Sequence, residues 1–128
     1  MTLYELQRSS DITYRLYDFD REDKNGNKRE LHIEDSLNNV NIPDDSDFIV
    51  KNAKGNIFNS QYFSLFLYDD NNINFSTGNA KWLIMTVING NGQIDDLDVK
   101  VGETFMYLLD STPVIKGNLE ILIAWINK

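Results

Sequence analysis

The sequence predicts a mostly-β fold with one short helix, and three observations support this prediction. Clusters of Gly, Asn and Asp interrupt the chain, as in Lys24-Asn25-Gly26-Asn27 and from Asn89 to Gly92, and such residues favour turns. The segments between them are rich in β-branched and aromatic residues, which favour strands. After Gln61 the turn signals recur about every 8–12 residues, which is typical of a sandwich or barrel.

Six short runs are expected to form strands. In the second of them, Arg15 alternates with Tyr14 and Leu16, and this period of two places them on opposite faces of a strand. The six runs are Leu3 to Leu6, Ile12 to Tyr17, Tyr62 to Tyr68, Trp82 to Ile88, Thr104 to Leu109 and Leu119 to Ile126.

One helix is expected from about Glu30 to Val40, because Leu31, Glu34 and Leu37 recur with a spacing closer to 3.6 than to 2. Pro43 follows shortly after, as expected beyond a helix end. The next stretch is polar and forms a linking loop. We therefore expect an N-terminal arm over residues 1–55 and a β-domain over residues 56–128.

Composition limits the classes of function. The 128 residues carry a net charge of −8, which argues against nucleic acids and anionic membranes as partners. The chain has no cysteine, which excludes disulfides and thiolate zinc sites and fits a cytoplasmic protein. The start of the chain shows no signal-peptide pattern, and no apolar run approaches a membrane span.

The charges are unevenly distributed along the chain. Basic residues are denser from Arg8 to Arg29, so a phosphate-bearing ligand is expected near this segment rather than near the acidic cluster. The cluster of Asp44, Asp45 and Asp47 lacks the spacing and closing glutamate of a calcium-binding EF-hand loop, and it predicts a solvated loop.

The β-domain contains a pattern of glycines that is typical of one fold. A run from Val87 to Ile94 carries a Gly-x-Gly sequence, and a second run from Val99 to Phe105 carries Gly102-Glu103. Glycine suits tight turns because it adopts positive φ without a steric penalty. The succession of strand, Gly-x-Gly turn, strand and Gly-acidic turn resembles a cupin jelly roll. Metal-binding cupins place histidines around such glycines, and this half of the chain has none.

Nearly the whole chain resembles the type I mannose-6-phosphate isomerases of low-GC Gram-positive bacteria. The longest match is Leu3 to Asp18, and the later motifs fit the C-terminal cupin domain of that family. The other matching segments are Arg21, Asp23, Asn25-Gly26, Arg29 to Glu34, Tyr62-Phe63-Ser64, Gly90-Asn91-Gly92 and Gly117-Asn118-Leu119-Glu120.

The resemblance implies the C-terminal half of an enzyme that interconverts mannose 6-phosphate and fructose 6-phosphate with one zinc ion. The family's zinc ligands lie before the segment that matches Leu3, and this chain has one histidine. Catalytic zinc needs about three protein ligands and an open position. We therefore expect no metal site and no cofactor in this chain, and little activity from the chain alone.

The resemblance leaves three functions open. The chain is an isomerase-related protein that is inactive alone, a non-catalytic module that binds a sugar phosphate, or a subunit that completes a separately encoded zinc-bearing half. Unpaired strand edges in the arm favour pairing with another chain, so we also expect a homo-oligomer formed through the arm, or binding to the missing half.

Three residues are candidates for the site. The resemblance implies that Arg15 is a catalytic and substrate-binding arginine that stabilises enediol charge; the alternative is a surface arginine. His32 lies near the substrate cleft, or it is a helix-start histidine bonded to a neighbour. Arg29 contacts substrate phosphate through paired hydrogen bonds, or forms an exposed ion pair with Glu30.

Aromatic residues in the β-domain could form a platform for a sugar, but at strand spacing they are more often core. We predict that they are core residues: Trp82, Trp125, Phe63, Phe66, Phe75 and Phe105.

Overall fold

The structure of the chain is a computed structural model that describes residues 3–7, 9, 11–44, 49–71 and 73–127. It divides into two compact units, Met1–Phe48 and Ile49–Lys128, called unit 1 and unit 2 below and described separately. This division falls earlier in the chain than the boundary expected between residues 55 and 56.

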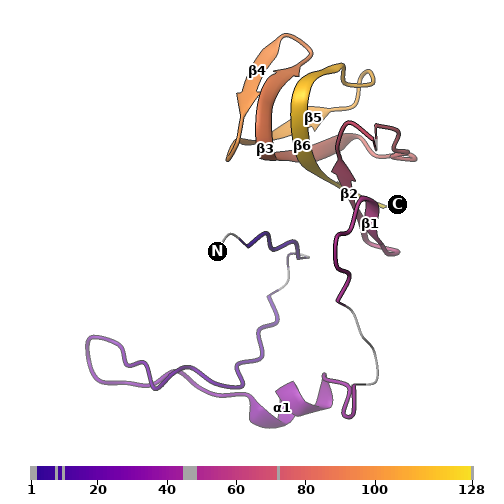
Figure 1. Cartoon of the computed structure of the whole chain (residues 1–128). Helices are drawn as coiled ribbons and strands as arrows, with labels where there is room; N and C mark the ends of the chain where they lie inside the picture. The colour runs from indigo at the N-terminus through magenta and orange to yellow at the C-terminus, as the bar shows by residue number, and fades with distance from the viewer. Residues whose placement is uncertain (1–2, 8, 10, 45–48, 72, 128) are drawn as a thin grey trace. The chain divides into compact units, whose positions relative to one another are not determined.

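Unit 2 is a single antiparallel sheet. Its strands follow the order β1-β2-β6-β3-β4, and β5 pairs with β3. The long strands β3 and β6 lie side by side (Figure 1) and pair from Ile84–Ala124 to Ile94–Ile115. The strands are β1 (Gly55–Asn59), β2 (Phe63–Tyr68), β3 (Trp82–Ile94), β4 (Leu97–Lys100), β5 (Thr104–Leu108) and β6 (Ile115–Ile126).

Alternation along these strands creates two different faces of the sheet. The inner face carries the hydrophobic core, with Leu83 and Met85 of β3 beside Ile121 and Ile123 of β6, all fully buried. The core also includes two of the expected aromatic residues, Phe66 and Trp125. Phe75 and Phe105 pack against the core, whereas Phe63 and Trp82 are half-buried outside it.

The other side of the sheet, called the outer face below, is also apolar. Register places Met106, Ile84, Ala124 and Leu65 in one row across β5, β3, β6 and β2. Adjacent positions on the same strands carry apolar or Thr side chains, and Met106 is among the exposed hydrophobic residues. These adjacent residues are Phe63, Leu67, Trp82, Thr86, Thr104, Leu108, Leu122 and Ile126.

The predicted Gly-x-Gly turn is wrong, because Gly90 and Gly92 lie inside β3. They face β6, where Gly92 pairs with Gly117. A Cβ on Gly92 would lie 2.1 Å from the Lys116 carbonyl oxygen. The glycines therefore permit close contact between two strand backbones.

The chain instead reverses between β3 and β4 at Asp95-Asp96, where Asp95 has φ of 52°. The Asp95 carboxylate accepts hydrogen bonds from the Val114 amide at 2.8 Å and the Tyr107 hydroxyl at 2.9 Å. The predicted Gly-acidic turn is present: Gly102 has φ of 90°, and the Glu103 carboxylate accepts a bond from the Lys100 amide.

Unit 1 contains one short helix, α1 (Ile33–Asn38), which is shorter than the expected span from Glu30 to Val40. No side chain caps its first turn, and uncapped short helices gain little from propensity alone. In the described part of the arm, Leu3 to Leu6 and Ile12 to Tyr17 form no strand, contrary to prediction. A strand needs a partner strand, and within the described residues the backbone of Arg15 bonds to His32 alone.

The buried side chains of unit 1 are polar. Among its described residues only Asp18 and Ser36 are buried, whereas the apolar side chains are half-buried or exposed. Unit 1 thus lacks a hydrophobic core within its described residues. The mostly-β class with one short helix is confirmed for the chain, with an open rather than a closed sheet. No helix in the described ranges is long and apolar enough to cross a membrane.

Candidate arginine and histidine site

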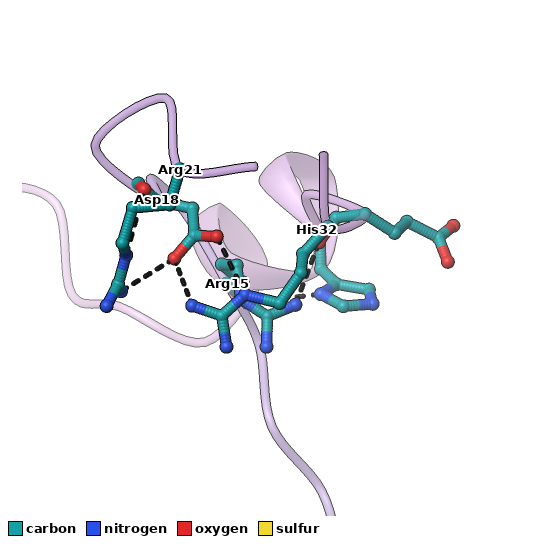
Figure 2. A network of polar contacts seen from close by, with 6 residues as sticks. Arg15, Asp18, Arg21 and His32 are labelled. Carbon is teal, nitrogen blue, oxygen red and sulfur yellow. Dashed lines mark hydrogen bonds and ion pairs between the residues drawn. The ribbon is translucent and has the colours of Figure 1, made fainter. Parts of the chain in front are cut away.

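The three predicted site residues lie in one polar network of unit 1 (Figure 2). Arg15 precedes the loop that contains Asp18, and Arg29 and His32 follow the turn at Asp23 to Asn27. The Asp23 carboxylate accepts hydrogen bonds from the amides of Asn25 and Asn27, which closes this turn. The turn brings the two sides of the network together.

Asp18 is the centre of the network. It is 6% exposed, and its carboxylate accepts hydrogen bonds from Arg29 through both oxygens, with Nε at 2.7 Å from Oδ2. The Arg21 guanidinium donates to the same carboxylate at 2.8 Å. Arg29 therefore pairs with Asp18 rather than with the neighbouring Glu30, so the expected local pair is wrong.

This geometry shifts the ionisation of both partners. The hydrogen bond from Arg29 and, to a smaller extent, that from Arg21 hold the pKa of the Asp18 carboxyl below its usual 3.8, although burial acts in the opposite direction. The Asp18 carboxylate raises the pKa of Arg29 in turn. Asp18 is thus a fixed anion at neutral pH.

Two hydrogen bonds join the Arg15 backbone to the imidazole ring and the backbone amide of His32. The Arg15 amide donates to His32 Nδ1 at 3.1 Å, and the His32 amide donates to the Arg15 carbonyl at 2.7 Å. Because Nδ1 accepts a hydrogen bond, a neutral His32 carries its proton on Nε2. The Arg15 guanidinium donates through Nη1 to the Glu30 carbonyl at 2.9 Å, and this is its one hydrogen bond within the described residues.

The arginines of the network keep cationic groups exposed to solvent. Two guanidinium groups, those of Arg21 and Arg29, contact the buried Asp18 carboxylate, and their side chains are 64% and 52% exposed. Arg15 retains N–H donors that no described residue uses. Such donors can bind the oxygens of an anionic ligand.

A metal ion does not fit these residues. Among the residues that the structure describes, no group of three His, Asp or Glu side chains could hold one. His32 already uses Nδ1 as an acceptor, and Asp18 is enclosed by arginines. The family's zinc chemistry therefore has no ligand set in this part of the chain.

Two members of the network, Asp18 and Arg21, were not predicted as site residues. Both lie within segments that carry the family resemblance. The sequence of Asp18 followed by Arg21 and Arg29 is compatible with an ion pair. Sequence spacing does not predict that Asp18 and Arg29 pair, because the turn between them brings them together.

Comparison with known proteins agrees with this resemblance. No family model matches the chain. The putative mannose-6-phosphate isomerase YvyI of Bacillus subtilis is 32% identical over 95% of this chain and 42% of the relative. The mannose-6-phosphate isomerase of Streptococcus mutans is 58% identical over 31% of this chain and 13% of the relative.

A solved structure extends the likeness to three dimensions. The mannose 6-phosphate isomerase from Bacillus subtilis matches with a TM-score of 0.63 and 32% identity, over 90% of this chain and 40% of that one. The chain spans less than half the length of these proteins. The chain is therefore a homologue of mannose-6-phosphate isomerases over part of their length.

Proposed function

We propose that this chain is the sugar-phosphate-binding part of a mannose-6-phosphate isomerase and is inactive alone. The observation that carries this proposal is the fixed position of Arg15, whose backbone is held by His32 and whose guanidinium is held by the Glu30 carbonyl. The names of the relatives supply the isomerisation of mannose 6-phosphate, and the family resemblance implies fructose 6-phosphate as its product.

Arg15 has a chemical role in this proposal. Moving a proton between C1 and C2 of the sugar passes through an enediolate, whose negative charge forms on oxygens next to the reacting carbons. A guanidinium that is already oriented stabilises such charge without reorganising in the transition state. Arg29 acts as a positioning residue, because its paired hydrogen bonds to Asp18 fix the loop between Arg15 and Arg29. His32 orients the Arg15 backbone.

The metal step is assigned to another polypeptide segment. The described residues of this chain form no zinc site, so the proposal places the metal ligands in a segment outside this sequence. The apolar side chains of unit 1 support a partner, since Leu3, Phe19 and Ile42 are more than 70% exposed. The same surface supports a homo-oligomer if the other half is absent.

An isomerase assay tests this proposal. We expect no conversion of mannose 6-phosphate by the purified chain with added zinc. Activity should appear when the chain is mixed with the segment of Bacillus subtilis YvyI that it does not match. In that mixture Arg15→Ala should lower kcat by about 10²–10³-fold, the usual effect of removing one donor to a developing oxyanion. Lys100→Ala, an exposed lysine on β4, serves as the control.

Two results would contradict the proposal. Full activity of the chain alone would show that a metal site exists within it. No activity in the mixture, with the two parts shown to associate by light scattering, would instead favour the non-catalytic module. Titration with mannose 6-phosphate by calorimetry then measures binding, which Arg15→Ala should abolish.

A further inference from the structure

Unit 2 contains a cavity of about 580 Å³ that plays no part in the proposed isomerase site. It lies where the ends of β1, β2 and β6 meet residues 74–79, and its described lining residues belong to unit 2. This volume lies within the range of about 300–1,000 Å³ that is typical of small-molecule sites.

One side of the cavity is aromatic. Phe66, Phe75 and Trp125 line it in series, with ring centroids 5.4 Å apart for the first pair and 6.2 Å for the second. Phe66 and Trp125 are only 6% and 7% exposed, so the core fixes their positions. This side presents a small, rigid apolar surface.

A polar framework fixes the strand ends beside the aromatic residues. Asn127 Nδ2 donates to Ser64 Oγ at 2.9 Å and to Asn59 Oδ1 at 3.1 Å, and Ser64 Oγ lies 2.8 Å from Asn59 Oδ1. Asn127 belongs to the chain just after β6, Asn59 to β1 and Ser64 to β2. The three side chains therefore bond to one another and join three segments at the cavity.

A second group of lining side chains is available to a ligand. These side chains make no hydrogen bond to any described residue. Their amide and hydroxyl groups can each donate and accept hydrogen bonds. They come from β1 and from the segment before β3: Asn56, Asn74, Ser76, Thr77 and Asn79. A cavity whose side chains can each both donate and accept a hydrogen bond suits a ligand with many hydroxyl groups, because a hydroxyl also does both.

Among the residues that the structure describes, no side chain lining the cavity is charged. The described lining therefore supplies neutral hydrogen-bonding groups rather than a cation for a phosphate or an anion for an amine. We propose that it binds a neutral sugar ring of the hexopyranose class. The sugar hydroxyls bond to the amides and hydroxyls of the second group, and the C–H face of the ring packs against the aromatic side. This site is separate from the arginine site, which takes the phosphorylated sugar.

Titration of the full chain followed by NMR amide shifts tests the proposal. We expect saturable shifts with methyl α-mannopyranoside at millimolar concentration, confined to residues around the cavity and including the Trp125 indole N–H. Glycerol, a polyol without a ring, should produce no saturable shift. Asn79→Ala should weaken sugar binding about 10-fold, the effect of losing about 1.4 kcal/mol.

Asn74→Ala is a second variant with the same expected effect, in case one substitution disturbs folding. Asn91→Ala, an exposed asparagine of β3 outside the cavity, is the matched control. No saturable shift with any neutral hexose overturns the proposal. Equal sugar affinity in the folded Asn74→Ala and Asn79→Ala variants overturns it as well.

A third arm separates the two sites. Arg15→Ala should leave binding of the neutral sugar unchanged while it abolishes binding of mannose 6-phosphate. Loss of both ligands in Arg15→Ala would show that one site binds both and would overturn the separate neutral site. Loss of sugar-phosphate binding alone supports the separation, and failure of the isomerase assay does not affect it.

Discussion

Asp18 shows how a single side chain organises a unit that lacks a hydrophobic core. Burial of a carboxylate is unfavourable unless charged partners satisfy it, and here two guanidinium groups do so. Because the pKa of Asp18 is lower in the folded chain than the ordinary 3.8, its contribution to stability is complete at neutral pH. That contribution is lost as the pH falls through the folded-state pKa.

The order of the two arginine contributions can be measured. Following the Asp18 carboxyl carbon by NMR against pH, we expect a pKa below that of an unstructured peptide. Arg29→Ala should raise the pKa of Asp18 most of the way back to its ordinary value, because the hydrogen bond from Arg29 is the largest cause of the lowering. Arg21→Ala should raise it by a smaller amount. An equal effect of the two variants would contradict the paired geometry.

A second prediction concerns the glycines between β3 and β6. Gly92→Ala places a methyl group 2.1 Å from the Lys116 carbonyl oxygen, so we expect it to lower the free energy of unfolding by about 1–3 kcal/mol. Gly78→Ala meets no atom within 4 Å, although its φ of 57° adds backbone strain, and it is the control. Urea unfolding should show the larger loss for Gly92→Ala.

At the scale of elements, the sequence predicted strands wherever the hydrophobic alternation was long. Four expected runs coincide with strands. The runs from Tyr62 and Thr104 match β2 and β5, the run from Trp82 matches the first part of β3, and the run from Leu119 matches the last part of β6. The six expected runs did not include β1 and β4, which are only 5 and 4 residues long. Gly90-Asn91-Gly92 was interpreted as a turn. Glycine marks a turn or a close backbone contact equally well, and only the neighbouring strand decides between them.

The asparagine framework at the strand ends gives a prediction at the same scale. Asn127→Ala removes the donor to Ser60, Asn59 and Ser64 and leaves the buried Ser64 hydroxyl with fewer partners. We expect a loss of about 1–2 kcal/mol in unfolding free energy, measured by chemical denaturation. Asn56→Ala, which breaks no hydrogen bond within the described residues, should change stability little.

For the whole molecule, the main property that the sequence did not predict is the difference between the two units. Unit 2 has a hydrophobic core, whereas the described residues of unit 1 form none. Resemblance located Arg15, Arg29 and His32, and the structure places them in one network. It could not show that Asp18 joins them, because pairing depends on the turn at Asp23. Strands in the arm were predicted from the alternation around Arg15, but a strand requires a partner, and the described residues of unit 1 supply none.

Hydrogen exchange should report this contrast directly. We expect the amides of β3 and β6 to be protected at the level of global unfolding, whereas the amides of unit 1 exchange rapidly in the chain alone. Binding of a zinc-bearing half should slow exchange in unit 1. Equal protection in both units of the isolated chain would contradict a unit without its own hydrophobic core.

The outer face of the sheet has a consequence for how the protein behaves in solution. Its rows from β5 across to β2 carry no charged side chain, so the net charge of −8 resides elsewhere and keeps molecules apart by long-range repulsion. Salt shortens the range of this repulsion, while salts such as sulfate strengthen apolar association. The chain should therefore precipitate early in a sulfate series and remain dispersed in dilute buffer.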